Sequence, residues 1–245
     1  MTDPKRSEQL PLALPSATAM GREDFLSAPP NALALAALDD PRGLPGGLAV
    51  LVGPEGSGKT HLAHVWAAQA GARWQRVDSL SEDLPALLAP DAPGAVVIDD
   101  AQRLAGTAGE EALFHLVNHL RGRGQLLLTA PAPVRDWGLA LPDLVSRLSA
   151  AAHPALAEPD EALLAAVLVK LFNDRQLRVE PDQIDYLVAR MERSLAAARS
   201  LVARLDRRSL QLKRGISQPL LREALAEDQA AELDPDLDND TRGQA

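Results

Sequence analysis

Short apolar runs alternate with helical patterns through the middle of the chain. The runs that predict strands lie at residues 48–52, 73–77, 95–98 and 125–129, and a last run at 151–156 is interrupted by Pro154. A helical pattern follows the first run, and others recur at 81–88, 110–120 and 141–149. Strands that alternate with helices in this way predict an α/β fold with a parallel sheet.

The pattern changes after Pro159, where only helical stripes of apolar residues remain. Pro181 suits the first turn of one of these helices, and Ser194 suits the N-cap of the next. We therefore expect four parts, which are a disordered arm (1–20), an α/β domain (21–158), a helical domain (159–226) and an acidic, disordered tail (227–245).

A glycine-rich turn joins the first predicted strand to its helix, and it consists of Gly53, Pro54, Glu55, Gly56, Ser57, Gly58, Lys59 and Thr60. It matches the phosphate-binding pattern G-x-x-x-x-G-K-[ST] in the required context between a strand and a helix. The glycines let backbone N–H groups approach an anion, and the helix adds the positive end of its dipole. We expect this turn to bind a nucleotide, with Lys59 on the β- and γ-phosphates and Thr60 on Mg²⁺.

Two aspartates directly follow the run 95–98, at the sheet edge where open α/β sheets bind ligands. We expect the carboxylate of Asp99 to hold Mg²⁺ through water. Asp100 lies where many ATPases of this layout keep the acid that polarises the attacking water. A simple turn at the strand end explains Asp100 equally well.

Two further residues could contribute to catalysis. Thr129 ends the run 125–129, where it can reach the attacking water or the γ-phosphate, or merely end a strand. Arg147 lies roughly 120° away from the apolar stripe of its helix, so it faces solvent or a partner. Spacing alone favours a solvated charge, whereas the alternative is an arginine finger that completes a neighbouring subunit's nucleotide site.

The predicted arm contains a short apolar motif in a segment that Pro11 and Pro15 keep extended. Its residues are Gln9, Leu10, Leu12 and Leu14. An extended peptide with alternating apolar anchors suits the groove of another protein. The pattern equally allows these leucines to pack on the chain's own surface.

Composition narrows the class of protein. The 245-residue chain has no cysteine, which excludes disulfides and thiolate chemistry and fits a reducing cytosol. Its formal net charge of −9 argues against a broad footprint on a nucleic-acid backbone. No apolar run approaches the length of a membrane span. We therefore expect a cytoplasmic protein.

Four segments, GPEGSGKTHLAH, VVIDDAQRLAG, EEALFHLVNHL and DLVSRLSA, occur in this order ahead of the helical region. Together they resemble the AAA+ module of the bacterial replication initiator DnaA, and still more the short regulatory relatives of the Hda family, over roughly residues 7–226. The resemblance implies an AAA+ P-loop core followed by an all-helical lid. It makes Arg147, within DLVSRLSA, the candidate arginine finger, and QLPLAL the candidate clamp-binding peptide.

The resemblance to the Hda family implies a negative regulator of replication initiation, associated with the replisome or nucleoid. With ADP or ATP and Mg²⁺ bound, such a protein sits on the DNA polymerase sliding clamp and makes DnaA hydrolyse its ATP. DnaA continues beyond its lid into a helix-turn-helix domain, whereas a short acidic stretch follows here, so we expect no sequence-specific DNA-binding domain. The sequence leaves open whether the chain is a homo-oligomer.

The chain departs from the family pattern at two positions. Pro131 occupies the strand-end position where these relatives usually carry an aspartate, and Ala196 aligns with the lid arginine that contacts nucleotide in DnaA. Arg193 and Arg199 lie about one turn on either side of Ala196 on the same helix face and are the candidate substitutes, Arg193 being the predicted nucleotide contact. These changes predict firm nucleotide binding with weak intrinsic hydrolysis.

Two other functions fit parts of the sequence. One is an ATP-dependent adaptor or loader for an initiator or helicase, and the other is a stand-alone P-loop phosphotransferase. The clamp-like peptide favours the regulator over the loader. The purely helical region after residue 158 argues against the phosphotransferase, which needs an acceptor site with its own acids and bases.

Overall fold

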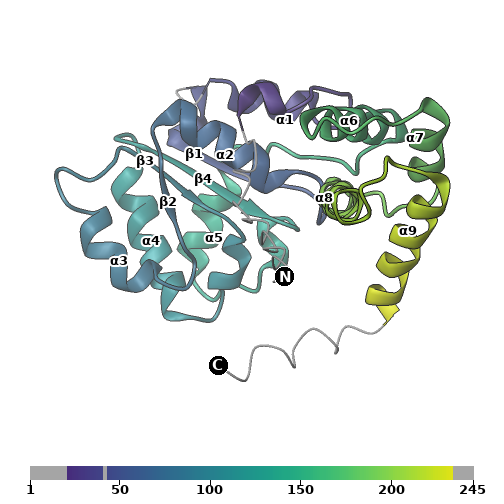
Figure 1. Ribbon diagram of the computed structural model, residues 1–245. Coiled ribbons are helices and arrows are strands. Elements are labelled where there is room, and N and C mark those ends of the chain that lie inside the picture. Colours follow the sequence, from purple (N-terminus) through teal and green to yellow (C-terminus); the bar gives the residue numbers. More distant parts are fainter. Residues whose placement is uncertain (1–20, 41–42, 234–245) are drawn as a thin grey trace, which may run out of the picture.

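The computed structural model describes residues 21–40 and 43–233, and its centre is a parallel four-stranded sheet (Figure 1). The strands are β1 (Leu48–Val52), β2 (Arg73–Gln75), β3 (Ala95–Ile98) and β4 (Gln125–Ala130), in the order β1-β4-β3-β2. The chain also runs beside β1 after residue 151, where parallel bridges join Ala49 to Ala152 and Val52 to Ala155. The predicted last strand is thus present as an interrupted edge segment.

Helices cover both faces of the sheet, which explains why its strands are apolar almost throughout. Leu48 and Val50 of β1 face one core, into which α3 (Leu80–Leu87), α4 (Ala108–Leu120) and α5 (Pro142–Ser149) pack. Ala49 and Leu51 face the other core, with α1 (Ala32–Leu38) and α2 (Lys59–Ala70). The sequence pattern did not predict α1.

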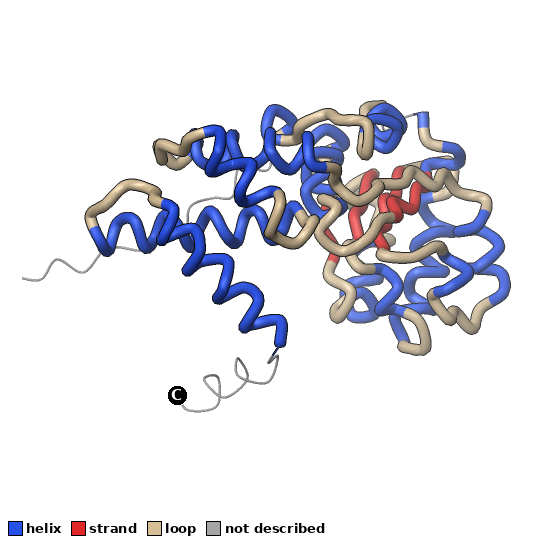
Figure 2. Tube along the Cα trace, turned by 90° about the vertical axis from the view of Figure 1, so that its right-hand side faces the viewer, coloured by secondary structure: helices blue, strands red, loops and turns tan. Residues whose placement is uncertain are grey.

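The remaining helices form a separate bundle with its own core. They are α6 (Glu161–Asp174), α7 (Pro181–Val188), α8 (Leu195–Leu212) and α9 (Gln218–Leu233). Figure 2 shows that all the strands lie in one half of the molecule, and that only helices and loops make up the other. Leu26 and Ala28, which precede α1, pack against the bundle core and so join the two halves.

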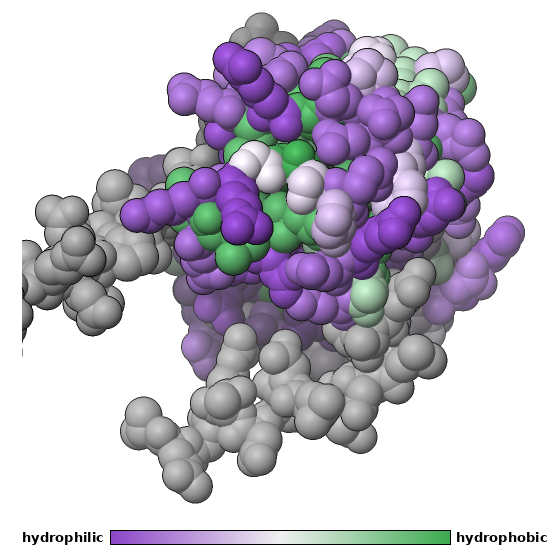
Figure 3. Space-filling view, turned by 45° about the vertical axis from the view of Figure 1, so that its right-hand side comes forward, coloured by the Kyte–Doolittle hydropathy of each residue, from purple (hydrophilic) through white to green (hydrophobic). Residues whose placement is uncertain are grey.

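The expected helices and strands occur within a few residues of their predicted bounds, with one correction. The acidic tail was expected to be disordered from residue 227, but α9 continues to Leu233. Within the described ranges, no helix is both long enough and apolar enough to cross a bilayer. On the face in Figure 3, hydrophilic side chains cover most of the surface and hydrophobic ones gather near the middle.

Candidate functional site

The glycine-rich loop connects β1 to α2 at the carboxyl edge of the sheet. Gly56 (φ +69°) and Gly58 (φ +99°) have left-handed backbone conformations, and Gly58 is the N-cap of α2. A Cβ atom on Gly53 would lie 2.8 Å from both the Leu156 carbonyl oxygen and Ser57 Oγ. The loop therefore requires glycine at these positions for conformation or space, as the phosphate-binding pattern predicts.

Lys59 lies folded over the loop. Its ammonium donates hydrogen bonds of 2.8 Å to the carbonyl oxygens of Gly53 and Pro54. Burial lowers the pKa of Lys59, although Asp100, Asp99 and Glu55 act in the opposite direction. A buried ammonium whose only hydrogen-bond partners among the described residues are carbonyl oxygens is well placed to donate hydrogen bonds to phosphate oxygens as well.

Ser57 gives a second sign that the loop holds a ligand. Its hydroxyl oxygen is buried and has no hydrogen-bond partner, although most buried hydroxyls have one. Because the side chain lies between the loop glycines, an anion in the loop is a suitable partner for it. The residues present thus fit a bound phosphate chain.

A hydrogen-bonded network links the loop to the ends of β3 and β4. The Thr60 hydroxyl donates to Asp99 Oδ2 at 2.9 Å, and the Thr129 hydroxyl donates to Asp99 Oδ1. The structure thus brings together both predicted Mg²⁺ ligands, which are 39 positions apart in sequence. A hydroxyl and a carboxylate are oxygen ligands that suit Mg²⁺, which binds few protein groups and keeps waters or phosphates as its other ligands.

Thr129 is fully buried, and its hydroxyl contacts both candidate acids. It accepts a 3.0 Å hydrogen bond from the Asp100 backbone N–H while it donates to Asp99. Asp100 itself has a left-handed φ of 54° and an exposed side chain. This geometry makes Thr129 a positioning residue for the acids, and catalytic roles for Thr129 and Asp100 stay predictions.

The helical bundle contacts the loop through the start of α8. The Leu195 N–H donates to the Gly56 carbonyl at 2.8 Å, and a Cβ atom on Gly56 would lie 2.0 Å from Ser194 Oγ. Ser194 caps α8, because its hydroxyl accepts the Ala197 N–H at 3.2 Å, as the sequence predicted. Ala196, next to Leu195, is exposed and offers no charge to a nucleotide.

The two candidate substitutes for the lid arginine have other partners in the structure. Arg193 precedes α8, so the expectation that it shares a helix face with Arg199 is wrong. Its guanidinium forms an exposed 2.7 Å ion pair with Glu161. Arg199 Nη2 lies 2.7 Å from Nδ1 of His61, on α2. A contact of Arg193 with nucleotide stays a prediction.

A cavity of about 560 Å³ lies between the segment before α1, the start of α2 and the bundle. Its polar wall includes His61, Arg199 and Lys170. Lys170 donates to Asp24 at 2.7 Å and to Asp174 at 2.8 Å, and these bonds raise its pKa. The cavity is next to the phosphate loop, because Leu195 lines it and also contacts Gly58 and Gly56.

Arg147 lies on α5, away from the loop, and is half-buried. Its guanidinium carbon is 5.7 Å from the centre of the Phe114 ring, a cation–π contact between α5 and α4. Buried Glu110, at the start of α4, accepts the N–H groups of Ala140 and Leu141 at 2.7 Å each. Glu110 therefore holds the N-terminus of α5 and positions the helix that carries Arg147.

Sequence reasoning missed His61, Lys170 and Glu110. His61 and Glu110 are buried polar residues within otherwise apolar helix faces, and this is the only signal that could have identified them. Lys170 gave no such signal, because its partner Asp24 is 146 positions away. The predicted clamp-binding residues Gln9, Leu10, Leu12 and Leu14 lie outside the described residues.

Comparisons with known proteins match both halves of the chain. The family model for the Hda lid domain matches residues 160–225. Domain III of the replication initiation protein DnaA from Thermotoga maritima is similar over 85% of this chain and 96% of that one, with 19% identity and a TM-score of 0.75.

Two further solved structures share the fold. AMPPCP-bound DnaA from Aquifex aeolicus has 19% identity and a TM-score of 0.65, over 89% of this chain and 72% of that one. The RuvB Holliday junction branch migration motor from Thermotoga maritima has 22% identity and a TM-score of 0.61, over 79% and 65%. At these identities the likeness establishes a shared fold.

Proposed function

Because the chain is a DnaA-related AAA+ protein that carries the Hda lid domain, we propose that it is a nucleotide-bound regulator of chromosomal replication initiation. In this proposal it binds the DNA polymerase sliding clamp and stimulates DnaA to hydrolyse ATP, which inactivates the initiator. The observation that carries the proposal is an Hda lid in direct contact with an intact phosphate loop, through the hydrogen bond from Leu195 to Gly56.

The first part of the proposal is a bound nucleotide. Its phosphates would lie in the loop against Lys59 and the Ser57 hydroxyl, and its base and ribose would lie in the cavity beside His61. Thr60 and Asp99 would hold Mg²⁺, which neutralises phosphate charge when bound. AMPPCP bound to a DnaA of the same fold supports this placement.

The second part is that the bound nucleotide turns over slowly. Pro131, after the end of β4, offers no carboxylate, and Ala196 offers no guanidinium at the loop. The Thr129 hydroxyl already forms hydrogen bonds with Asp99 and with the backbone of Asp100. The loop thus keeps its binding groups while the groups that would respond to a γ-phosphate are weakened. A single-turnover measurement on the isolated chain should give hydrolysis well below ordinary ATPase rates, and a normal rate would contradict this part.

The third part is that Arg147 acts on the nucleotide of a partner. Arg147 lines a cavity together with Leu48, the first residue of β1, so it lies near the amino edge of the sheet. The chain's own phosphate loop follows the other end of β1. Arg147 therefore lies away from the chain's own phosphates. An arginine finger typically accelerates hydrolysis by about 10³–10⁵.

The test is hydrolysis of DnaA-bound ATP with clamp loaded on DNA. The wild-type chain should accelerate hydrolysis, and Arg147→Ala should abolish the acceleration while leaving nucleotide and clamp binding unchanged. Equal stimulation by the variant would show that Arg147 is not the finger. No stimulation by the wild-type chain would remove the proposed function itself.

A further inference from the structure

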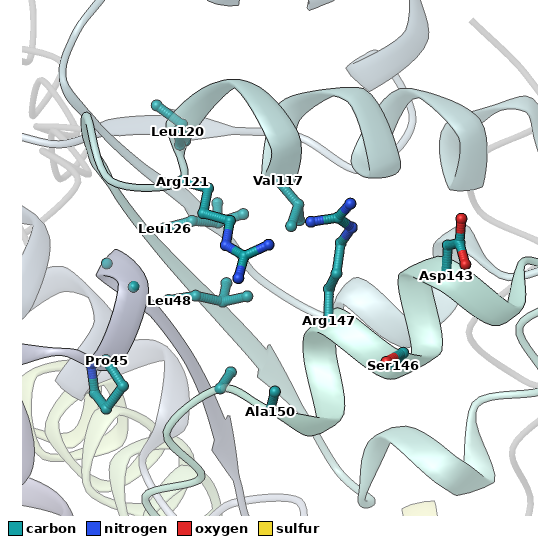
Figure 4. Close-up of a pocket in the computed structure, with 13 residues that line it drawn as sticks. Pro45, Leu48, Val117, Leu120, Arg121, Leu126, Asp143, Ser146, Arg147 and Ala150 are labelled. Carbon is teal, nitrogen blue, oxygen red and sulfur yellow. The ribbon is translucent and has the colours of Figure 1, made fainter.

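A cavity of about 460 Å³ lies between α4 and α5 at the amino edge of the sheet (Figure 4). Its apolar wall is formed by Leu48, Val117, Leu120 and Leu126. The guanidinium groups of Arg121, from the C-terminus of α4, and of Arg147, from α5, point into this space. The cavity is therefore lined by two cations above an apolar floor.

Neither arginine forms an ion pair with any residue in the described part of the chain. Asp143 lines the same cavity one turn before Arg147, yet it pairs with neither. What sets these two apart is that both guanidinium groups face the same cavity. Two like charges that face one cavity repel each other, and an anion between them would relieve that repulsion.

We propose that Arg121 is a second guanidinium that acts together with Arg147 on the phosphates of the nucleotide held by the partner AAA+ protein. The inference rests on the proposed function, which assigns Arg147 to that nucleotide. Phosphate oxygens are the chemistry that two converging guanidinium groups recognise best, since each offers several N–H donors in a fixed plane.

The reaction in the partner is ordinary hydrolysis of ATP. Water attacks the γ-phosphorus, the bond from that phosphorus to the β–γ bridging oxygen breaks, and the products are ADP, inorganic phosphate and a proton. Charge accumulates on the γ-phosphoryl and bridging oxygens as that bond breaks. Arg147 and Arg121 would each donate hydrogen bonds to this charge, so both affect the rate of the chemical step.

Arg123 provides a matched control. It follows Arg121 by two residues, is also exposed, and forms no ion pair with any described residue. It lines a different hollow, next to Gly94 and Gln125, and does not line the cavity between α4 and α5. Arg123→Ala therefore changes the net charge by the same amount as Arg121→Ala but leaves the proposed site unaltered.

The experiment measures hydrolysis of DnaA-bound ATP, with the clamp on DNA and increasing amounts of the full chain. We expect Arg121→Ala to lower the rate at saturation by about tenfold to a hundredfold, less than the loss from removing a finger. Arg121→Lys should recover part of that loss, because it restores the charge, and Arg123→Ala should match the wild-type chain. Thermal unfolding and nucleotide binding of all variants should be unchanged.

Three outcomes would overturn the inference. If Arg121→Ala raises only the half-saturating concentration and keeps the maximal rate, Arg121 is a docking residue. If Arg121→Ala and Arg123→Ala lose equal activity, the effect is one of net charge. If Arg147→Ala abolishes stimulation and Arg121→Ala matches the wild-type chain, the inference fails while the proposed function stands. Absence of stimulation by the wild-type chain would instead remove the proposed function.

Discussion

The guanidinium of Arg199 lies 2.7 Å from Nδ1 of His61, a contact that joins lid helix α8 to α2, the helix that begins in the phosphate loop. Because a guanidinium only donates, Nδ1 accepts and the ring proton is on Nε2, which lies 3.4 Å from the Gly21 carbonyl. Burial, followed by Arg199, lowers the pKa of His61 to about 4, so the ring is neutral at pH 7.

This contact predicts that acid weakens the fold. The unfolded chain binds a proton at His61 near pH 6.5, whereas the folded chain binds it only near pH 4. The free energy of unfolding should therefore fall as the pH drops from 6.5 to 4, and His61 should account for about 3 kcal/mol of this fall. Above pH 6.5, His61 should make no contribution to the pH dependence. Urea unfolding at a series of pH values measures the slope.

His61→Gln isolates this contribution, since its amide oxygen can still accept from Arg199 but does not titrate. The variant should lose the part of the pH dependence that His61 causes. The charged and titratable groups that act on the ring electrostatically remain in place, and they are Asp24, His64 and Arg199. His115→Gln, on an exposed side chain, is the control. An unchanged slope in His61→Gln would show that the folded and unfolded chains bind the His61 proton at the same pH, which would contradict the lowered pKa.

Gly56→Ala should weaken nucleotide binding by at least about tenfold. The new Cβ would collide with Ser194 Oγ at 2.0 Å and push the lid away from the loop. Gly71→Ala is the matched control, because Gly71 has a similar φ of +61° but nothing within 4 Å of a Cβ atom. Both variants carry the left-handed strain of about 1–2 kcal/mol, so their difference in affinity, measured by calorimetry, reports the lid contact. Equal affinities would show that the contact does not affect binding.

Glu110→Gln should destabilise the fold by about 1–3 kcal/mol, because one amide oxygen cannot replace a carboxylate that accepts three N–H groups. Burial alone would raise the pKa of Glu110, but bonds from Gly106, Leu141 and Ala140 outweigh it and hold the pKa below its usual value. Its contribution is thus present above about pH 4.5 and is lost as the pH falls through the folded-state pKa.

The same variant should reduce stimulation of DnaA, because Glu110 holds the start of the helix that carries Arg147. Glu111→Gln, on the exposed face one residue on, should leave both the free energy of unfolding and the stimulation unchanged. Thermal unfolding and the ATPase assay measure the two effects. Full stability in Glu110→Gln would contradict the role given to this carboxylate.

Replacing Leu12 and Leu14 together by Ala should weaken binding to the sliding clamp by about tenfold or more, since apolar anchors dominate such peptide contacts. Nucleotide binding should not change. Leu33→Ala, at a side chain that is 85% exposed, is the control for loss of a surface leucine. Surface plasmon resonance on immobilised clamp gives the affinities, and equal values for all three proteins would place the clamp contact elsewhere.

Local sequence patterns were sufficient to predict most of the helices and strands of the fold. The strand, glycine loop and helix around Lys59 are contiguous, so turn chemistry and apolar periodicity alone predicted them. The helical stripes after residue 159 are equally local, and Pro181 and Ser194 lie at the helix starts as predicted. Helix α1 was missed because it is short and rich in alanine, so its apolar stripe is weak.

The sequence by itself determined the phosphate loop, the alternation of strands and helices, and the presence of the lid, because these depend on neighbours a few positions apart. Only the tertiary structure decided that Thr129 binds Asp99, that Arg199 contacts His61 and that Arg121 shares a cavity with Arg147. Each pair joins different elements, and periodicity says which face of an element is buried but not which residue of another element lies opposite. That choice depends on strand register and helix packing, which the whole chain sets together.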